Sequence, residues 1–110
     1  MSKASAYTLV LSTCPDQHTA EQLASRLVET SLAACVNILG PLRSVYRWKG
    51  AVQQDDEVLL MIKTHVDRYA EVEQLILQQH PYELPEVIRV AIGGGSSDYL
   101  AWIRRCLEID

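Results

Sequence analysis

Residues 34–64 constrain the fold of this chain more than any other stretch. They predict a long β-hairpin that turns at Lys49-Gly50, since glycine readily supplies a positive φ in a two-residue turn. The returning arm contains residues 58–62, VLLMI, which are apolar at every position. Successive residues of a strand point to opposite faces of a sheet, so both faces at this strand must be covered. The outgoing arm ends in Tyr46 and Trp48, an exposed aromatic edge that a small domain cannot easily bury by itself.

Length and charge narrow the class of protein. The 110 residues suit one domain, residues 1–110, and 48% of them are hydrophobic and 22% charged, as in ordinary globular proteins. The formal net charge of −4 and the lack of a run of Lys or Arg argue against a nucleic-acid partner. We also expect no membrane partner, because no apolar run approaches the roughly 20 residues of a membrane span. Residues 1–6 show no signal-peptide pattern, which predicts a cytoplasmic protein.

Hydrophobic periodicity predicts an order of strands and helices along the chain. A strand at 7–13 leads into a helix that starts at Pro15-Asp16, with proline at its first position and aspartate near its positive dipole end. Its predicted inner face comprises Ala20, Leu23, Ala24, Leu27, Val28 and Ser31. The later elements are the two hairpin arms, a helix at 67–80, a strand at 87–92 and a last helix capped by residues 96–98.

This order, β-α-β-β-α-β followed by a helix, predicts an α+β, ferredoxin-like sandwich with an extra C-terminal helix. Two helices cover one face of a four-stranded antiparallel sheet in that fold. The third strand is central, in agreement with its apolar residues 58–62, and the second is an edge, in agreement with the interruption at Gly40-Pro41.

The opposite face of the sheet should then be polar, yet the third strand is apolar on both sides. The last helix can cover part of that face. Other copies of the chain cover the rest most simply, and the aromatic edge at Tyr46 and Trp48 could pair with a neighbour. The pattern therefore predicts an obligate homo-oligomer.

Several motifs together resemble the CutA divalent-cation tolerance family over nearly the whole chain. They are LAACVNI at 32–38, SVYRWKG at 44–50, EVLLMIKT at 57–64, HPY at 80–82, Pro85-Glu86, and Tyr99-Leu100 with Trp102. The resemblance implies a cytoplasmic homotrimer arranged like the trimeric PII signalling proteins. It also implies a link to tolerance of copper and other divalent metal ions.

His80 and Cys14 are the candidate metal ligands, because imidazole binds copper or zinc and a thiolate suits Cu(I). The resemblance implies that copper-binding members use a cysteine on the first strand and two adjacent histidines before Pro-Tyr. This chain departs from that pattern, with Ser12 at the strand position and Gln79 in place of the first histidine. The alternative for His80 is a structural role at the helix C-terminus. The other two histidines, His18 and His65, are expected to be solvated.

A second candidate cluster contains Lys63, Tyr82 and Glu86, with Tyr46 and Trp48 contributed by a neighbouring subunit. An ion pair of Lys63 with Glu86, ringed by aromatic side chains at a subunit junction, could bind a small anionic ligand. The alternative is a structural salt bridge that seals the trimer.

Enzymatic patterns are weak in this sequence. Cys14 precedes a helix N-terminus, which could lower the pKa of its thiol, but the only nearby histidine is His18. The three cysteines lack a CxxC spacing and are expected to be reduced. We therefore expect a protein that is not an enzyme. Two functions stay open: a trimeric metal-tolerance protein that binds copper or related ions, and a PII-like module that binds a small-molecule effector or a partner protein.

Overall fold

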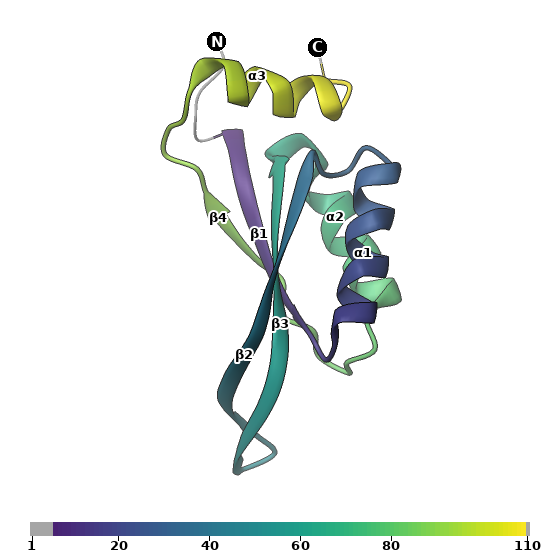
Figure 1. Ribbon diagram of the computed structural model, residues 1–110, viewed down its shortest axis with the longest axis vertical. Helices are drawn as coiled ribbons and strands as arrows, with labels where there is room; N and C mark the ends of the chain where they lie inside the picture. Colours follow the sequence, from purple (N-terminus) through teal and green to yellow (C-terminus); the bar gives the residue numbers. More distant parts are fainter. Residues whose placement is uncertain (1–5, 110) are drawn as a thin grey trace.

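A computed structural model of the protein describes residues 6–109 (Figure 1). Residues 1–5, part of the segment without a signal-peptide pattern, lie outside the described range. The elements follow the predicted order: β1 (Tyr7–Cys14), α1 (Gln17–Glu29), β2 (Cys35–Trp48), β3 (Ala51–His65), α2 (Val66–Gln79), β4 (Ile88–Ala91) and α3 (Ser97–Cys106). Among the described residues, no helix is both long and apolar enough to cross a membrane.

The four strands form one sheet in the order β2-β3-β1-β4, and each neighbouring pair is antiparallel. This is the ferredoxin-like topology, with α1 and α2 side by side on one face (Figure 1). The predicted central position of β3 and edge position of β2 are confirmed. The pairing of β2 with β3 is irregular between Leu39 and Leu42, where the Gly40-Pro41 interruption lies.

The start of α1 differs from the prediction. Asp16 is the N-cap rather than a residue of the first turn, and Pro15 lies before the cap. The side chain of Asp16 accepts a hydrogen bond from the Thr19 N–H at 2.8 Å, which satisfies one of the free amides at the helix start. Val28 was predicted to face the sheet but is 44% exposed. Helical steps of 100° place it at the margin of the buried stripe, which ends at Leu27.

Helix α2 spans residues 66–79 rather than the predicted 67–80, and a histidine caps each of its ends. His65 is the N-cap and accepts a hydrogen bond from the Asp67 N–H at its Nδ1, and His80 is the C-cap. The prediction that His65 is solvated is wrong: it is 5% exposed and its ring lies edge-on to Tyr7 at 5.1 Å. Burial lowers the pKa of His65, so the neutral ring that this capping bond requires is favoured. His18 is exposed, as predicted.

The main core lies between the sheet and the first two helices. Val10, Leu60 and Ile62 point from the central strands toward Leu27 and Ile76, and all five side chains are fully buried. Leucine, isoleucine and valine side chains each contribute about 1.5–3 kcal/mol when they are buried in this way. A smaller cluster joins the end of the sheet to α3, which lies across that end in Figure 1.

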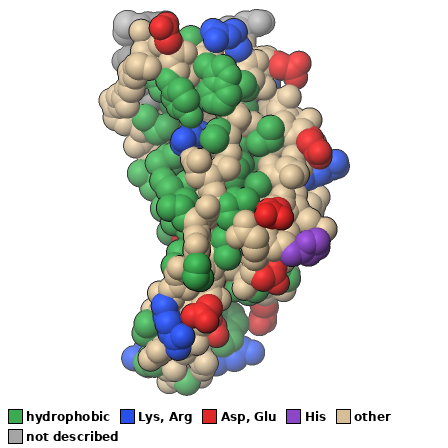
Figure 2. All heavy atoms as spheres, in the orientation of Figure 1, with side chains coloured by type: hydrophobic (Ala, Val, Ile, Leu, Met, Phe, Trp, Pro, Cys, Tyr) green, Lys and Arg blue, Asp and Glu red, His purple; other side chains and the backbone are tan. Residues whose placement is uncertain are grey.

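The other face of the sheet lacks a helix over most of its length (Figure 1). Directly paired residues of antiparallel strands point to the same face, and the register therefore identifies the side chains of this open face. They are Leu9, Leu11, Thr13, Cys35, Asn37, Leu39, Leu59, Met61, Lys63, Ile88 and Val90. Each of them is partly or largely exposed in the single chain, and Ile88 reaches 50%. In Figure 2 hydrophobic side chains gather over the sheet and beneath α3.

The hairpin extends well beyond the helices (Figure 1). Its turn places Lys49 at φ 50° and Gly50 at φ 81°, so both turn residues are left-handed, as the twist of a two-residue hairpin favours. Lysine is an unusual residue for such a position. The turn nevertheless forms where the sequence predicted it.

Burial on the helix-covered face predicts the cost of truncating a side chain there. We expect Leu60→Ala, at a fully buried position, to lower the free energy of unfolding by about 2–5 kcal/mol. Leu77→Ala is the matched control, because the Leu77 side chain is 53% exposed on α2. Urea unfolding at one fixed chain concentration measures both. Similar losses for the two variants would contradict the placement of Leu60 in the core.

Candidate functional site

A pocket of about 760 Å³ lies where the hairpin leaves the body of the protein. The hairpin forms one wall and the segment between α2 and β4 forms the other. Its lining residues are Thr13, Ser44, Val45, Tyr46, Arg47, Trp48, Asp55, Glu57, Pro81, Tyr82, Glu83, Leu84 and Glu86. Glu57 lies on the same face of β3 as Leu59 and Met61, because every second residue of a strand points to the same side. The pocket therefore adjoins the end of the open face that is nearest to the hairpin.

Tyr82 and Glu57 join the two walls. The Tyr82 hydroxyl donates a hydrogen bond of 2.7 Å to Glu57 Oε2, and Glu57 is only 7% exposed. Burial, together with the hydrogen bond and the charge of Glu57, raises the pKa of Tyr82. Tyr82 is therefore a protonated phenol at neutral pH and a donor to the carboxylate.

Tyr46 makes a second tyrosine–carboxylate pair within the hairpin. Its hydroxyl donates to Asp55 Oδ2. This hydrogen bond is the main cause that raises the pKa of Tyr46. The pocket thus contains two carboxylates, each held by a tyrosine hydroxyl, on neighbouring parts of its wall.

Both ring nitrogens of His80 are engaged. Nε2 lies 2.7 Å from the carbonyl oxygen of Thr13, and Nδ1 accepts a hydrogen bond of 3.1 Å from the Tyr82 N–H. A carbonyl can only accept, so Nε2 carries the proton and the ring is neutral. A metal ion binds the lone pair of an imidazole nitrogen, and in this conformation no such lone pair is free. His80 ties the loop after α2 to the end of β1.

Cys14 directly follows Thr13, whose carbonyl oxygen contacts His80, but the Cys14 side chain packs in the core. The side chain is fully buried on the helix-covered face, where Ser12 also points. Burial is the largest cause that raises the pKa of Cys14 to about 11, and the charges of Asp16 and Glu57 add to it. The thiol is therefore protonated at neutral pH, whereas a metal ligand or a nucleophile must be a thiolate. Ser12, at the position where the resemblance implies a cysteine ligand, has a buried hydroxyl without a hydrogen-bond partner.

The residues present do not fit a metal centre within one chain. Across residues 6–109, no group of three or more His, Cys, Asp or Glu side chains comes close enough together to hold one ion. The candidate ligand Cys14 is buried in the core, and both ring nitrogens of His80 form hydrogen bonds with the backbone. Metal binding at this site would require both side chains to leave these positions.

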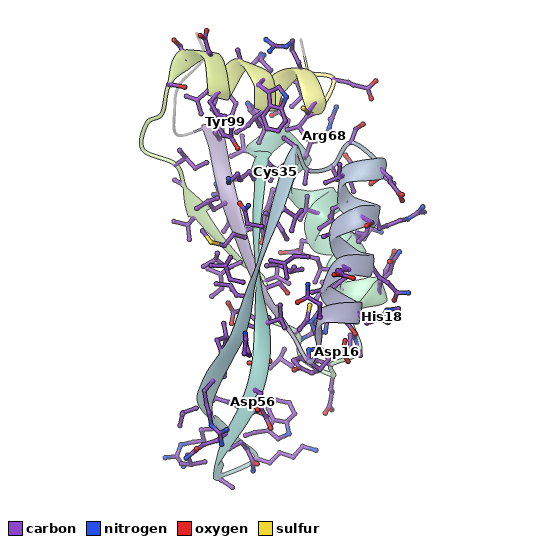
Figure 3. All side chains as sticks on the ribbon, viewed as in Figure 1. Asp16, His18, Cys35, Asp56, Arg68 and Tyr99 are labelled. Carbon is purple, nitrogen blue, oxygen red and sulfur yellow. The ribbon has the colours of Figure 1, made fainter. Side chains whose placement is uncertain are left out.

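The second predicted cluster is divided between two ends of the sheet. Tyr82, Glu86, Tyr46 and Trp48 line the pocket of the same chain, although the two hairpin aromatics were predicted to come from a neighbour. Lys63 lies instead at the other end, where its Nζ is 3.3 Å from Tyr99 Oη on α3. In Figure 3, Tyr99, the contact of Lys63, lies at the α3 end of the molecule, whereas Asp56 marks the hairpin at the opposite end.

The expected Lys63–Glu86 ion pair is therefore not formed within one chain; in the described part of the chain, Arg43 pairs instead with Asp56. The cause is the sheet register. Lys63 pairs with Leu9, whereas Glu86 precedes Ile88, which pairs with Leu11. The two charges thus lie several residues apart along the strand direction, on strands that are separated by β1.

Sequence reasoning missed Asp55 and Glu57. The turn at Lys49-Gly50 fixes the register of the hairpin, and counting back from it places Asp55 opposite Ser44, two residues from Tyr46. That signal could have identified Asp55. The contact of Glu57 with Tyr82 joins residues 25 apart in sequence, and only the folded chain reveals it.

The fold and the site can now be placed among known proteins. An antiparallel four-stranded sheet with two helices on one face and a protruding hairpin defines a ferredoxin-like protein. The sequence profile described as CutA1 divalent ion tolerance protein matches residues 8–106. This chain belongs to the CutA1 divalent ion tolerance family.

Individual relatives and structures agree with the family. The divalent-cation tolerance protein CutA of Thermus thermophilus is 42% identical over 96 residues, which cover 87% of this chain and 93% of that protein. Human protein CutA is 41% identical over 96 residues, covering 87% of this chain and 54% of the human protein, so the chain spans about half of that relative. The crystal structure of CutA from Xylella fastidiosa superposes with a TM-score of 0.91 at 39% identity and covers 94% of this chain and 99% of that one. The family and fold implied by the motifs are confirmed.

The raised pKa of Cys14 predicts its chemical reactivity. We expect iodoacetamide at neutral pH to label Cys14 much more slowly than Cys35 and Cys106, both of which are partly exposed. The reason is that the thiol is both buried and protonated. Peptide mass spectrometry of the folded protein measures the labelling, and unfolding in urea should make all three thiols react. Labelling of Cys14 as fast as Cys35 in the folded protein would contradict this placement.

Proposed function

We propose that this protein is a homotrimer that acts in divalent-cation tolerance, the role stated in the name of its family. The observation that carries the assembly is the open face of the sheet. Leu59 and Met61 of the central β3 lie on this face, together with Leu9 and Leu11 of β1. A contiguous apolar surface of this kind is rare on a soluble monomer and marks an interaction site.

A second copy of the chain is the simplest cover for this surface. The open face is continuous across all four strands and is mainly apolar, with Thr13, Asn37 and Lys63 as its polar members. The exposed edge strand β2 and the hairpin residues Val45 and Val52, 64% and 61% exposed, offer further apolar contacts. The pattern requires a partner but gives no number; the number three comes from the family resemblance.

A charge on the open face should dissociate the assembly. We expect wild-type protein to sediment as a particle of three times the 12.4 kDa chain mass, and Met61→Lys to sediment as single chains. The lysine places an ammonium group between the apolar side chains of Leu11 and Leu59, where burial of an unpaired charge is costly. Gln78→Lys makes the same charge change on the exposed side of α2 and should remain trimeric. Circular dichroism confirms that each variant is folded. A wild-type monomer at micromolar concentration, or a trimeric Met61→Lys, would refute the proposal.

Copper or another divalent ion is the ligand that the resemblance implies for this role. His80 and Cys14 as its ligands stay a prediction from the sequence. In the conformation described above, neither side chain presents a free lone pair or thiolate, which favours a tolerance role that does not depend on these two ligands.

Native mass spectrometry of protein recovered from copper-fed cells tests this expectation, because it reports subunit number and bound mass together. We expect His80→Ala to retain the same copper content as wild type, since the His80 nitrogens are engaged by Thr13 and Tyr82. His18→Ala, at an exposed position on α1, is the control. Loss of copper from His80→Ala alone would show that the ring turns outward and binds the metal.

The pocket favours a second candidate function, a PII-like module that binds a small-molecule effector. Its volume of about 760 Å³ lies within the range of roughly 300–1,000 Å³ typical of ligand sites. It also adjoins the open face, so in a trimer it would lie near a subunit junction. In either function we propose a non-enzymatic, cytoplasmic protein; the protonated Cys14 and the three free thiols support this.

A further inference from the structure

The pocket between the hairpin and the α2–β4 segment has an unusual charge balance. Four carboxylates line it, those of Asp55, Glu57, Glu83 and Glu86, against the single guanidinium of Arg47. The aromatic rings of Tyr46, Trp48 and Tyr82 form the rest of its functional lining. Carboxylates and ring faces both attract cations, and the ring of Trp48 already holds the ammonium of Lys49 at 5.8 Å.

Glu57 is the group that points to a missing ligand. It is more than nine-tenths buried, and Lys and Arg side chains of residues 6–109 form no ion pair with it. The Tyr82 hydroxyl donates one hydrogen bond to Glu57 Oε2. Because this donor is neutral, the negative charge of Glu57 still has no counter-charge. A buried carboxylate is costly unless it is paired with a cation. A cation in the pocket would supply that partner.

The arrangement of the carboxylates selects the class of cation. A metal ion such as Mg²⁺ or Ca²⁺ gathers about six to eight oxygens around one point. The described residues contain no convergent group of three acidic, histidine or cysteine side chains. Instead, the two tyrosine-held carboxylates, Asp55 on Tyr46 and Glu57 on Tyr82, are distinct anchors. Asp55 and Glu57 are alternate residues of β3 and so lie about 7 Å apart along the strand. Two anchors at this spacing, with aromatic walls beside them, suit an elongated organic cation with more than one ammonium group.

We propose that the pocket binds a small aliphatic polyamine, with one ammonium at Glu57 and another toward Asp55, and its methylene chain against Tyr46 and Trp48. This inference rests on the small-molecule candidate function above and names its ligand class. The carboxylates provide charge-assisted hydrogen bonds, and the rings provide cation–π and apolar contact.

Calorimetric titration with butane-1,4-diamine at neutral pH tests the site, with butane-1,4-diol as the uncharged probe of the same length. We expect wild type to bind the diamine and not the diol. Glu57→Gln retains the shape of the side chain and an acceptor for Tyr82, and it should weaken diamine binding about tenfold or more. Glu71→Gln removes a carboxylate from the exposed side of α2 and should bind as wild type does. Trp48→Leu, on the protruding hairpin, should also weaken binding and guards against a folding defect in Glu57→Gln.

Absence of diamine binding to wild type, equal binding of the diol, or undiminished binding by Glu57→Gln would each overturn the proposal. A lysine of a neighbouring copy in the pocket would also overturn it, since wild-type trimer would then reject the diamine. Sedimentation of the same samples separates this inference from the proposed function. A trimer that ignores the diamine refutes the polyamine site alone, whereas a monomer refutes the trimer proposed above.

Discussion

The central strand β3 must bury side chains on both of its faces, and the rest of the structure depends on this requirement. On one face, Leu60 and Ile62 pack under the two helices and form the core. On the other face, Leu59 and Met61 lie in a sheet surface without a covering helix. Because apolar surface is removed from water only by contact with another surface, we propose that other copies of the chain cover this second face. The fold of a single chain is thus complete in topology but incomplete in burial.

The same strand connects assembly with the candidate site. From Val58 toward the hairpin turn, the residues of β3 become polar, beginning with Glu57. Glu57 lies where the open face ends and also lines the pocket. Tyr82 reaches it from the segment after α2, and His80 holds that segment against Thr13 at the end of β1. His80 therefore has a structural role: it positions the segment that forms one wall of the pocket. Its neutral ring can perform this role because one nitrogen donates while the other accepts.

The sequence predicted the fold well and the site only in part. Alternation and periodicity are local signals, so the strands, the helices and the turn at Lys49-Gly50 were found near their true positions. The errors lie at helix ends: Asp16 and His65 are caps rather than a helical residue and a solvated side chain. Of the predicted second cluster, Tyr82 and Glu86 do lie together at the pocket, whereas Lys63 lies with Tyr99 at the far end of the sheet.

The sequence by itself determined the order of elements, the two-sided apolar strand and the family, because each is written in local patterns or in motifs along the chain. Only the tertiary structure decided which side chains meet. Sheet register separates Lys63 from Glu86, and chain packing joins Tyr82 to Glu57 and directs Cys14 into the core. The physical reason is that a strand's period of two fixes the face of each side chain, while its neighbours depend on pairing between segments far apart in the sequence.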